Sequence, residues 1–257
     1  MANATESVPI AAVRTTMQVV EALKRTDGAG VSELATELGM AKSTVHDHLT
    51  TLKRDGYVVE TDRSYQVSAR FLEIGGHRRS NTELFQVARP ELDELAHETG
   101  EHANLLIEEN GRGVFLYIAR GENAVRVDTV HHTGMYVHLQ TTSLGKAMLS
   151  TFPEDRVERI LDERGMPQVN ERTVTDRTEL FEELERIREQ GYATDDEERV
   201  AGMRCVGGPI AREEGTAVGA VSVSAPTSRM QGERFGTEIP RLVRRTANIV
   251  EVNLAYS

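Results

Sequence analysis

The sequence is short of several residue types, and each shortage excludes a class of protein. Its 257 residues contain no tryptophan and a single cysteine. Because a disulfide needs two cysteines, none can form within the chain. Proteins without disulfides are typical of a reducing compartment. No stretch approaches the roughly 20 consecutive apolar residues that span a bilayer, and the N-terminus lacks the basic-then-apolar order of a signal peptide. We therefore expect a cytoplasmic protein that does not insert into membranes.

Lysine is also scarce, because it supplies only 4 of the 30 basic residues, and the net charge is −11. The acidity is uneven: residues 1–70 hold 8 basic against 9 acidic residues, whereas the rest of the chain holds 22 against 32. An acidic, lysine-poor surface resembles that of proteins from salt-loving archaea. In a salt-rich cytoplasm counterion release contributes little to nucleic-acid affinity, so base contacts and shape would carry more of any such binding.

Residues 31–67 have the pattern of a winged helix-turn-helix. The apolar positions of a first short helix fall on one face: Val31, Leu34, Ala35 and Leu38. Gly39 then permits a sharp turn. In a second helix, Val45, Leu49 and Leu52 recur at helical spacing and turn inward. Residues 57–61 and 65–67 are β-prone on either side of a tight turn, as in a wing.

The outward side of the second helix carries short polar residues that suit a major groove. We expect these residues to contact DNA bases there: Ser43, Thr44, His46 and Thr50. Lys42 and Arg54 are expected near phosphates, and Arg63 at the wing tip in the minor groove. His48 lies nearer the inward face and is expected to be packed.

Beyond the wing the pattern becomes that of an α+β domain with an antiparallel sheet. Residues 68–76 are predicted to connect the winged helix-turn-helix to this second domain. An amphipathic helix kinked at Pro90 follows, and this helix either pairs with the same helix of a second chain in a dimer or packs on its own chain. Strands are predicted over 103–107, 114–119, 124–130, 137–140, 206–210 and 217–224, with a hairpin turn at Asn110-Gly111. Helices are predicted over 153–164, 177–190 and 233–255.

Residues 141–146 lead into a short helix, and the amides from Ser143 to Gly145 form either an anion cradle or an ordinary helix cap. A phosphate loop is excluded, because Gln140 stands where such a loop needs glycine and Ala147 where it needs a hydroxyl.

A second candidate feature is the carboxylate run from Asp195 to Glu198. Such runs are usually solvated faces, which is the expectation for residues 196–198, and Asp195 is the expected exception. Ser222 and Ser224 alternate with valines on a strand, so both hydroxyls emerge on one face and could donate to a carboxylate.

Enzymatic and metal chemistry have weaker support. Cys205 could be a nucleophile, but no local signature places a histidine beside it, and a lone cysteine is more often an inert small hydrophobe. His131, His132 and His138 do not form a metal site, because adjacent histidines on a strand point to opposite faces and no further ligand completes the set. No cofactor is expected.

Taken together, several segments resemble the IclR family of transcriptional regulators in their order: residues 39–46, the wing, and residues 142–147, 191–198, 202–209 and 222–226. The resemblance covers nearly the whole chain. It implies a winged helix-turn-helix domain (1–75), a linker helix (76–98) and a GAF-like effector domain (99–257). It also implies a homodimer or dimer of dimers on palindromic double-stranded DNA. In members with small-acid effectors, the pocket positions match Ser143, Leu144, Asp195, Cys205, Ser222 and Ser224.

The chain departs from the family pattern at two positions. Asp47 replaces a frequent arginine of the recognition helix, and Ser143 replaces a small glycine or alanine of the pocket wall. We expect a ligand-responsive regulator of catabolic genes that senses a small organic acid or a sugar-derived metabolite. Two alternatives stay open here: a catalytic GAF-like domain that uses Cys205, and an architectural DNA-binder without a ligand.

Overall fold

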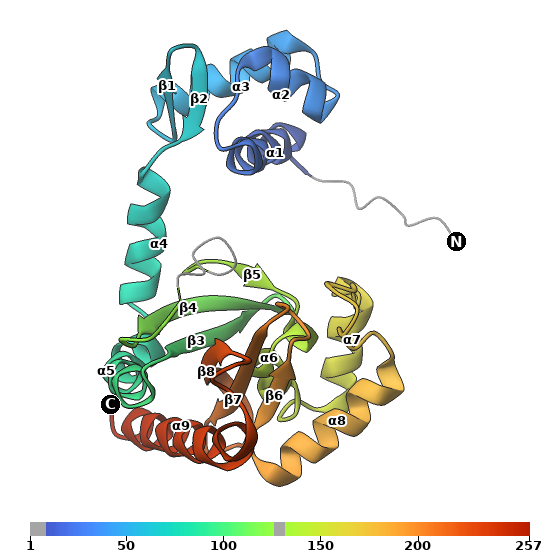
Figure 1. Ribbon diagram of the computed structural model, residues 1–257. Coiled ribbons are helices and arrows are strands. Elements are labelled where there is room, and N and C mark those ends of the chain that lie inside the picture. The colour runs from blue at the N-terminus through green and yellow to red at the C-terminus, as the bar shows by residue number, and fades with distance from the viewer. Residues whose placement is uncertain (1–8, 126–131) are drawn as a thin grey trace. The chain divides into compact units, whose positions relative to one another are not determined.

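The computed structural model describes residues 9–125 and 132–257, and the chain divides into two compact units, residues 1–78 and 79–257 (Figure 1). Each unit has a hydrophobic core of its own. No helix in the described ranges is long and apolar enough to cross a membrane.

The first unit packs three helices against a hairpin. The helices are α1 (Ala11–Thr26), α2 (Val31–Leu38) and α3 (Lys42–Arg54), and the strands are β1 (Val58–Thr61) and β2 (Ser64–Val67). The side chains buried between them include Val19, Leu23, Leu34, Val45, Leu49 and Leu52. Helix α1 is not predicted from the sequence, because its buried residues fall within positions 19–23, too short a stretch to show a helical period.

Both predicted turns of the winged helix-turn-helix are present. Gly39 ends α2 in the left-handed region, at φ 64°, where most other residues are strained. Asp62 and Arg63 both have positive φ, and Thr61 pairs with Ser64, so the wing closes with a two-residue hairpin loop. The first wing strand begins at Val58 rather than Tyr57, whose ring packs against Phe71 at a centroid distance of 5.4 Å.

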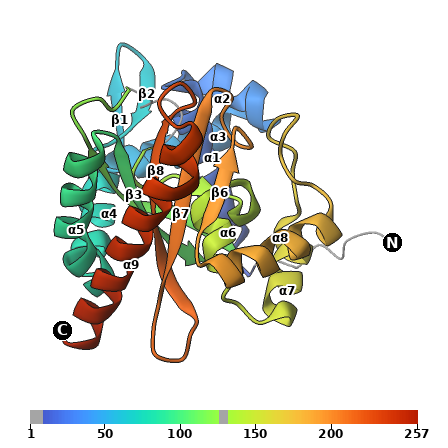
Figure 2. The same cartoon turned by 60° about the horizontal axis from the view of Figure 1, so that its bottom comes forward.

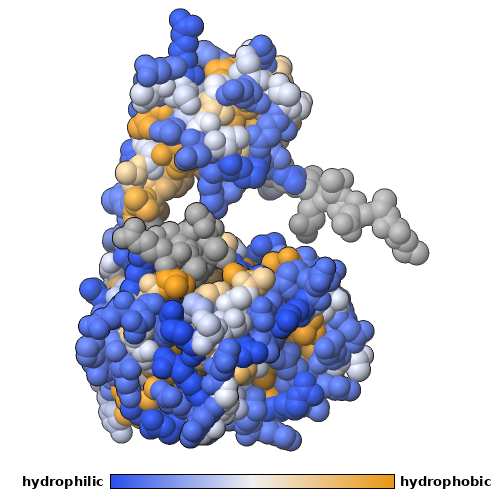
Figure 3. All heavy atoms as spheres, viewed as in Figure 1, coloured by the Kyte–Doolittle hydropathy of each residue, from blue (hydrophilic) through white to orange (hydrophobic). Residues whose placement is uncertain are grey.

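The predicted bridging segment over 68–76 is instead largely helical. Helix α4 (Arg70–Ser80) has no buried side chain, and Leu72 is 78% exposed. Hydrophobic residues are visible over this helix in Figure 3. Apart from Phe71, which packs against the core of the first unit, the apolar side chains of α4 are exposed, so its sequence lacks the apolar stripe by which a packed helix is recognised.

Helix α5 (Glu83–Thr99) packs on its own chain, as one of the two alternatives predicted. Its buried side chains, among them Leu92 and Leu95, join the core of the second unit. Pro90 lies within the helix and does not end it. The predicted linker over 76–98 therefore consists of the end of α4 and most of α5.

The second unit is built on a six-stranded antiparallel sheet with strand order β5-β4-β3-β8-β7-β6. The strands are β3 (His102–Glu109), β4 (Arg112–Arg120), β5 (Tyr136–Val137), β6 (Ala193–Asp196), β7 (Met203–Ala211) and β8 (Ala217–Pro226). The two central strands, β3 and β8, are far apart in sequence, so the sheet forms only when the beginning and the end of this unit come together.

The two faces of this sheet have different coverings. Helices α5 and α9 (Ile239–Ala255) cover one face, as Figures 1 and 2 show. The other face carries α6 (Ser143–Leu149), α7 (Glu154–Arg164) and α8 (Arg177–Gln190). Leu105 and Leu106 illustrate the division, since these neighbours on β3 belong to the two different cores.

Three predicted elements of this unit differ in the structure. The strand over 137–140 is only Tyr136–Val137, and a 3₁₀ turn, Leu139–Thr141, follows it. The strand over 124–130 lies mostly outside the described residues. The last helix begins with a π-helical turn, Arg234–Glu238, because Pro240 lacks the N–H that an α-helical bond to residue 236 needs.

Candidate functional site

The candidate effector site forms where polar side chains line up across the sheet. Asp195, Cys205 and Ser224 are register partners on β6, β7 and β8. A second row of register partners, next to the first, consists of Gly207, Ser222 and Asn104. Because register partners point to the same face of a sheet, strand order brings these distant residues together beneath α6.

A pocket of about 500 Å³, counting its open mouth, lies on this face. Six of the seven residues predicted for the effector site line it: Ser143, Leu144, Asp195, Cys205, Ser222 and Ser224. The pocket lining is completed by residues that were not predicted for it: Phe115, Thr142, Arg199, Val200 and Met203. Apolar side chains and hydroxyl groups thus surround a small space.

Gly145 is the one predicted residue that does not line the pocket. Its N–H donates to Thr142 Oγ1 at 2.9 Å, which is the ordinary helix cap of the two alternatives. A Cβ at this position would lie 2.0 Å from Leu139 O, so glycine permits the turn before α6 to pack closely. The predicted anion cradle therefore loses the Gly145 amide.

Gly207 shows how the pocket comes to lie so close to α6. A Cβ there would be 2.7 Å from the carbonyl carbon of Ser143 and 2.8 Å from Leu144 N. The absence of a side chain at Gly207 lets the first turn of the helix rest on β7. Ser143 is consequently 1% exposed, and its hydroxyl has no hydrogen-bond partner among the described residues. A buried hydroxyl without a partner is costly and favours a bound ligand.

The two serines of β8 share a donor that sequence analysis misses. Asn104 Nδ2 donates to Ser222 Oγ at 3.1 Å and to Ser224 Oγ at 2.9 Å. Each hydroxyl thus accepts a hydrogen bond from Asn104, which orients both side chains on the pocket face. No local pattern marks Asn104, because its role depends on the pairing of β3 with β8.

Asp195 has an unusual electrostatic environment. Burial, followed by the charge of Glu198, raises the pKa of its carboxyl group to about 7. Its Oδ1 accepts the backbone N–H of Glu198 at 2.8 Å, which holds the start of the loop after β6. Asp195 therefore both shapes the pocket wall and titrates near neutral pH.

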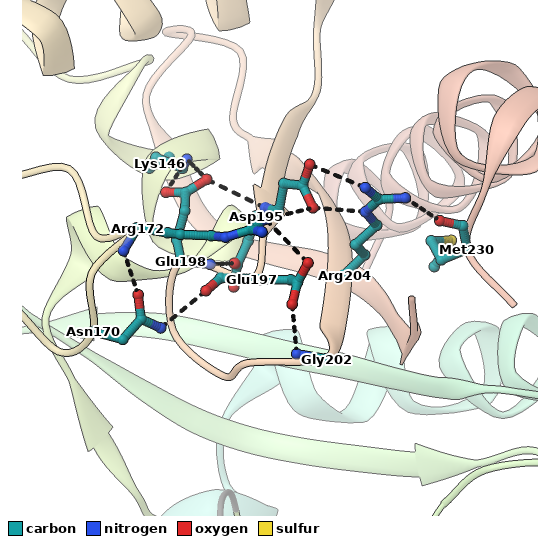
Figure 4. A network of polar contacts seen from close by, with 10 residues as sticks. Lys146, Asn170, Arg172, Asp195, Glu197, Glu198, Gly202, Arg204 and Met230 are labelled. Carbon is teal, nitrogen blue, oxygen red and sulfur yellow. Dashed lines mark hydrogen bonds and ion pairs between the residues drawn. The ribbon is translucent and has the colours of Figure 1, made fainter. Parts of the chain in front are cut away.

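The carboxylates after Asp195 are not a solvated face, contrary to expectation. Glu198 binds the fully buried Lys146, with Oε2 2.7 Å from Nζ, and Glu183 Oε1 lies 2.6 Å from the same atom. Burial alone would lower the pKa of Lys146, but these carboxylates raise it. Figure 4 shows Glu197 next to Asn170 and Arg172 in the same network. These residues neutralise one another, so Lys146 is structural.

The predicted DNA contacts all lie on exposed positions of the first unit: Lys42, Ser43, Thr44, His46, Thr50, Arg54 and Arg63. The inward face of α3 buries Val45, Leu49 and Leu52, which fixes the direction of the outward face. His48 hydrogen-bonds to Thr16 through Nδ1 at 2.9 Å and is packed as predicted.

Comparison with known proteins agrees with this architecture. Residues 12–62 match the IclR helix-turn-helix domain, and residues 77–252 match the bacterial transcriptional regulator IclR C-terminal domain. The chain is 36% identical to the probable HTH-type transcriptional regulator ArcR of Halobacterium salinarum, over 98% of this chain and 97% of that protein. The chain belongs to the IclR family of transcriptional regulators.

Solved structures of the IclR family have the same fold. The Thermotoga maritima IclR structure is 27% identical and superposes with a TM-score of 0.76, covering 95% of this chain and 98% of that one. An IclR homologue from Microbacterium hydrocarbonoxydans, solved with 4-hydroxybenzoate, is 22% identical with a TM-score of 0.75 and covers 94% and 100%. As an IclR-family member, the protein is a transcriptional regulator with a DNA-binding domain and an effector-binding C-terminal domain.

The family assignment argues against an enzyme, since ArcR of H. salinarum and the E. coli repressor IclR, both similar to this chain, are regulators. The chemistry of Cys205 agrees, because burial and the neighbouring Asp195 raise the pKa of its thiol well above the ordinary value. Such a thiol is a poor nucleophile at neutral pH.

The histidines provide no metal centre among the described residues, in which no group of three or more potential ligands occurs. His131 lies outside the described residues. His132 Nδ1 is 3.0 Å from Thr133 O, and burial lowers the pKa of His138.

Proposed function

We propose that the protein is a cytoplasmic regulator of catabolic genes whose C-terminal domain binds a small carboxylate. The observation that carries this proposal is the pair of hydroxyls on Ser222 and Ser224, each oriented by Asn104 and each lining the pocket. Two such donors match the oxygens of one carboxylate. The backbone N–H groups of Ser143 and Leu144 lie at the start of α6, where the helix dipole has its positive end, which favours an anion.

The pocket also has an apolar side, which would contact the carbon skeleton of the ligand. Phe115, Leu144 and Met203 form part of the lining and suit a short carbon skeleton. Asp195 would accept a hydrogen bond from a ligand hydroxyl or, when protonated, donate one. The homologue solved with 4-hydroxybenzoate provides a precedent for a hydroxylated carboxylate in this family.

On DNA, we propose that Ser43, Thr44, His46 and Thr50 read the major groove, while Lys42 and Arg54 approach phosphates and Arg63 enters the minor groove. The functional domains we assign are DNA-binding (1–75), linker (76–98) and effector (99–257). Exposed apolar residues on α4, including Leu72 and Ile74, support a homodimer or dimer of dimers that matches a palindromic operator. Ligand binding would regulate only by favouring one dimer geometry, typically by about 1–3 kcal/mol.

Chromatin immunoprecipitation with sequencing tests this function. We expect discrete palindromic peaks whose occupancy or transcriptional output changes when the cells receive one particular sugar or organic acid. Diffuse enrichment under every condition would contradict the role as a DNA-binding regulator.

Variants in the same assay separate the effector site from the DNA-binding surface. We expect Ser222→Ala/Ser224→Ala to keep the peaks and lose their response to the carbon source. Ser228→Ala, an exposed serine in the turn after β8, is the matched control and should respond normally. A double variant that responds normally would favour an architectural DNA-binder without a ligand.

A further inference from the structure

Helix α3 carries a carboxylate in the middle of its proposed DNA-reading face. Ser43, Asp47, Thr50 and Arg54 recur at i, i+4, i+7 and i+11, so they share the side of the helix that faces away from the buried Leu49. The side chain of Asp47 is 82% exposed. If α3 enters the major groove by this face, the Asp47 carboxylate comes to the edges of the bases.

This carboxylate is held only weakly by its own chain. Asp47 Oδ1 lies 3.5 Å from His46 Nδ1, and an exposed contact of this kind contributes little. The Thr51 hydroxyl bonds to the backbone oxygen of Asp47 and not to its carboxylate. Glu60 differs, because Lys53 pairs with it at 2.6 Å. Among the described residues, Asp47 Oδ2 has no hydrogen bond or ion pair, so it is available to a donor on DNA.

A carboxylate at this position opposes DNA binding unless a base donates to it. Phosphates repel it, and it loses water when the helix enters the groove, which is costly for a charge without a partner. An ionised carboxylate only accepts hydrogen bonds. In the major groove guanine presents two acceptors, thymine an acceptor and a methyl group, and adenine a donor beside an acceptor, whereas cytosine presents the N4 amino group as a donor alone. Cytosine is therefore the base that best offsets these costs.

We propose that Asp47 reads a cytosine in each operator half-site by accepting a hydrogen bond from its N4 amino group. This inference rests on the proposed DNA-reading face of α3 and names a base that one side chain of that face selects. Ser43 and Thr50 lie one turn to either side, and their hydroxyls both donate and accept, so they tolerate several bases. Asp47 selects because its charge also repels bases that present only acceptors.

Selection of binding sites from randomised DNA by the full chain tests this proposal without knowledge of the natural operator. We expect the wild-type half-site to contain one position at which cytosine is preferred roughly tenfold or more over the other bases. Asp47→Asn should change the preference at that position to adenine, whose N6 and N7 match a carboxamide. Asp47→Ala should lose the preference there and keep those at the other positions.

Asp55→Asn is the matched control, because Asp55 is an exposed residue at the C-terminal cap of α3 and its replacement removes the same charge. Its selected site should equal that of the wild type. The melting temperatures of all the variants should also equal that of the wild type, since the Asp47 carboxylate makes no contact beyond His46 among the described residues. A changed site then reports recognition and not unfolding.

A change in the DNA tests the same contact from the other side. The base 2-pyrimidinone is cytosine without the N4 amino group. Placed at the selected position, it should weaken binding by the wild type about tenfold more than binding by Asp47→Ala. An equal loss in the two proteins overturns the proposal, because the amino group would then act through the duplex and not through Asp47.

The remaining outcomes separate this proposal from the proposed function. If the wild-type chain enriches a palindromic site and Asp47→Asn enriches the same site, the regulator stands and the role of Asp47 is wrong. If Asp55→Asn alters the site as much as Asp47→Asn does, the effect is one of general charge, and the role of Asp47 is again wrong. If the wild-type chain enriches no sequence, the proposed DNA-reading face is overturned together with the Asp47 contact.

Discussion

Fully buried Lys146 and largely buried Glu198 form an ion pair, with Nζ 2.7 Å from Oε2, that joins helix α6 to the loop after β6. Both elements contribute pocket walls. The pair therefore fixes the distance between the amides at the start of α6 and the loop that carries Arg199. A buried ion pair of this kind is better evidence for a specific geometry than for a net gain in stability.

Removing one partner of this pair should be severe. Lys146→Met leaves Glu198 and Glu183 facing one another without a cation, and we expect a loss of about 3–5 kcal/mol in the free energy of unfolding. Urea denaturation measures it. Lys53→Met is the control, because Lys53 pairs with Glu60 at 2.6 Å on the surface, and its loss should be much smaller. Equal effects of the two variants would contradict the structural role of Lys146.

Asp195 should make stability depend on pH. Its folded-state pKa, about 7, lies above the ordinary value near 3.8, so the folded protein holds a proton that the unfolded chain releases. The resulting stabilisation is fully present below about pH 4 and is lost as the pH rises through about 7. We expect Asp195→Asn to flatten this decline, so that the variant gains stability relative to the wild type between pH 5 and pH 8, as judged from urea midpoints. Parallel pH profiles would show that Asp195 does not hold the proton.

Gly207, on which the first turn of α6 rests, should not tolerate a side chain. Gly207→Ala would place a methyl group 2.7 Å from the Ser143 backbone, and we expect a loss of about 1–3 kcal/mol. Gly75→Ala, on α4 where a Cβ meets nothing within 4 Å, is the matched control and should be neutral or stabilising. Thermal unfolding compares them, and equal melting temperatures would show that α6 does not rest on β7.

The wing arginine should contribute to DNA affinity. We expect Arg63→Ala to weaken binding to immunoprecipitated operator fragments and to reduce the slope of log K against log salt by about 1. Arg25→Ala is the control, because Arg25 is paired with Glu37 at 2.6 Å and lies on α1. An unchanged operator affinity in Arg63→Ala would rule out the minor-groove contact.

The acidic composition should make folding salt-dependent. With a net charge of −11, most of it beyond residue 70, mutual repulsion destabilises the folded chain at low ionic strength. We expect the melting temperature to rise between about 0.1 M and about 1 M KCl, over which the screening length falls from about 10 Å to about 3 Å. A melting temperature indifferent to KCl would count against adaptation to a salt-rich cytoplasm.

Much of the local structure can be predicted from the sequence, because its causes lie within one or two turns of chain. The spacing of Val45, Leu49 and Leu52 fixes the inward face of the recognition helix. Helix α8 runs over the predicted residues, from its cap at Asp176 to the left-handed Gly191. Helix α4 escapes prediction for the opposite reason, since a helix without a fully buried side chain has no periodic apolar pattern.

The sequence by itself determined the winged helix-turn-helix, the α+β class of the second unit and six of the residues around the pocket. The tertiary structure alone decided that Asn104 orients Ser222 and Ser224, that Lys146 is enclosed by Glu183 and Glu198, and that the Gly145 N–H is capped by Thr142. The physical reason is the order of strands. Local periodicity states which face a side chain occupies, whereas its neighbours on that face depend on which strands pair and in what register.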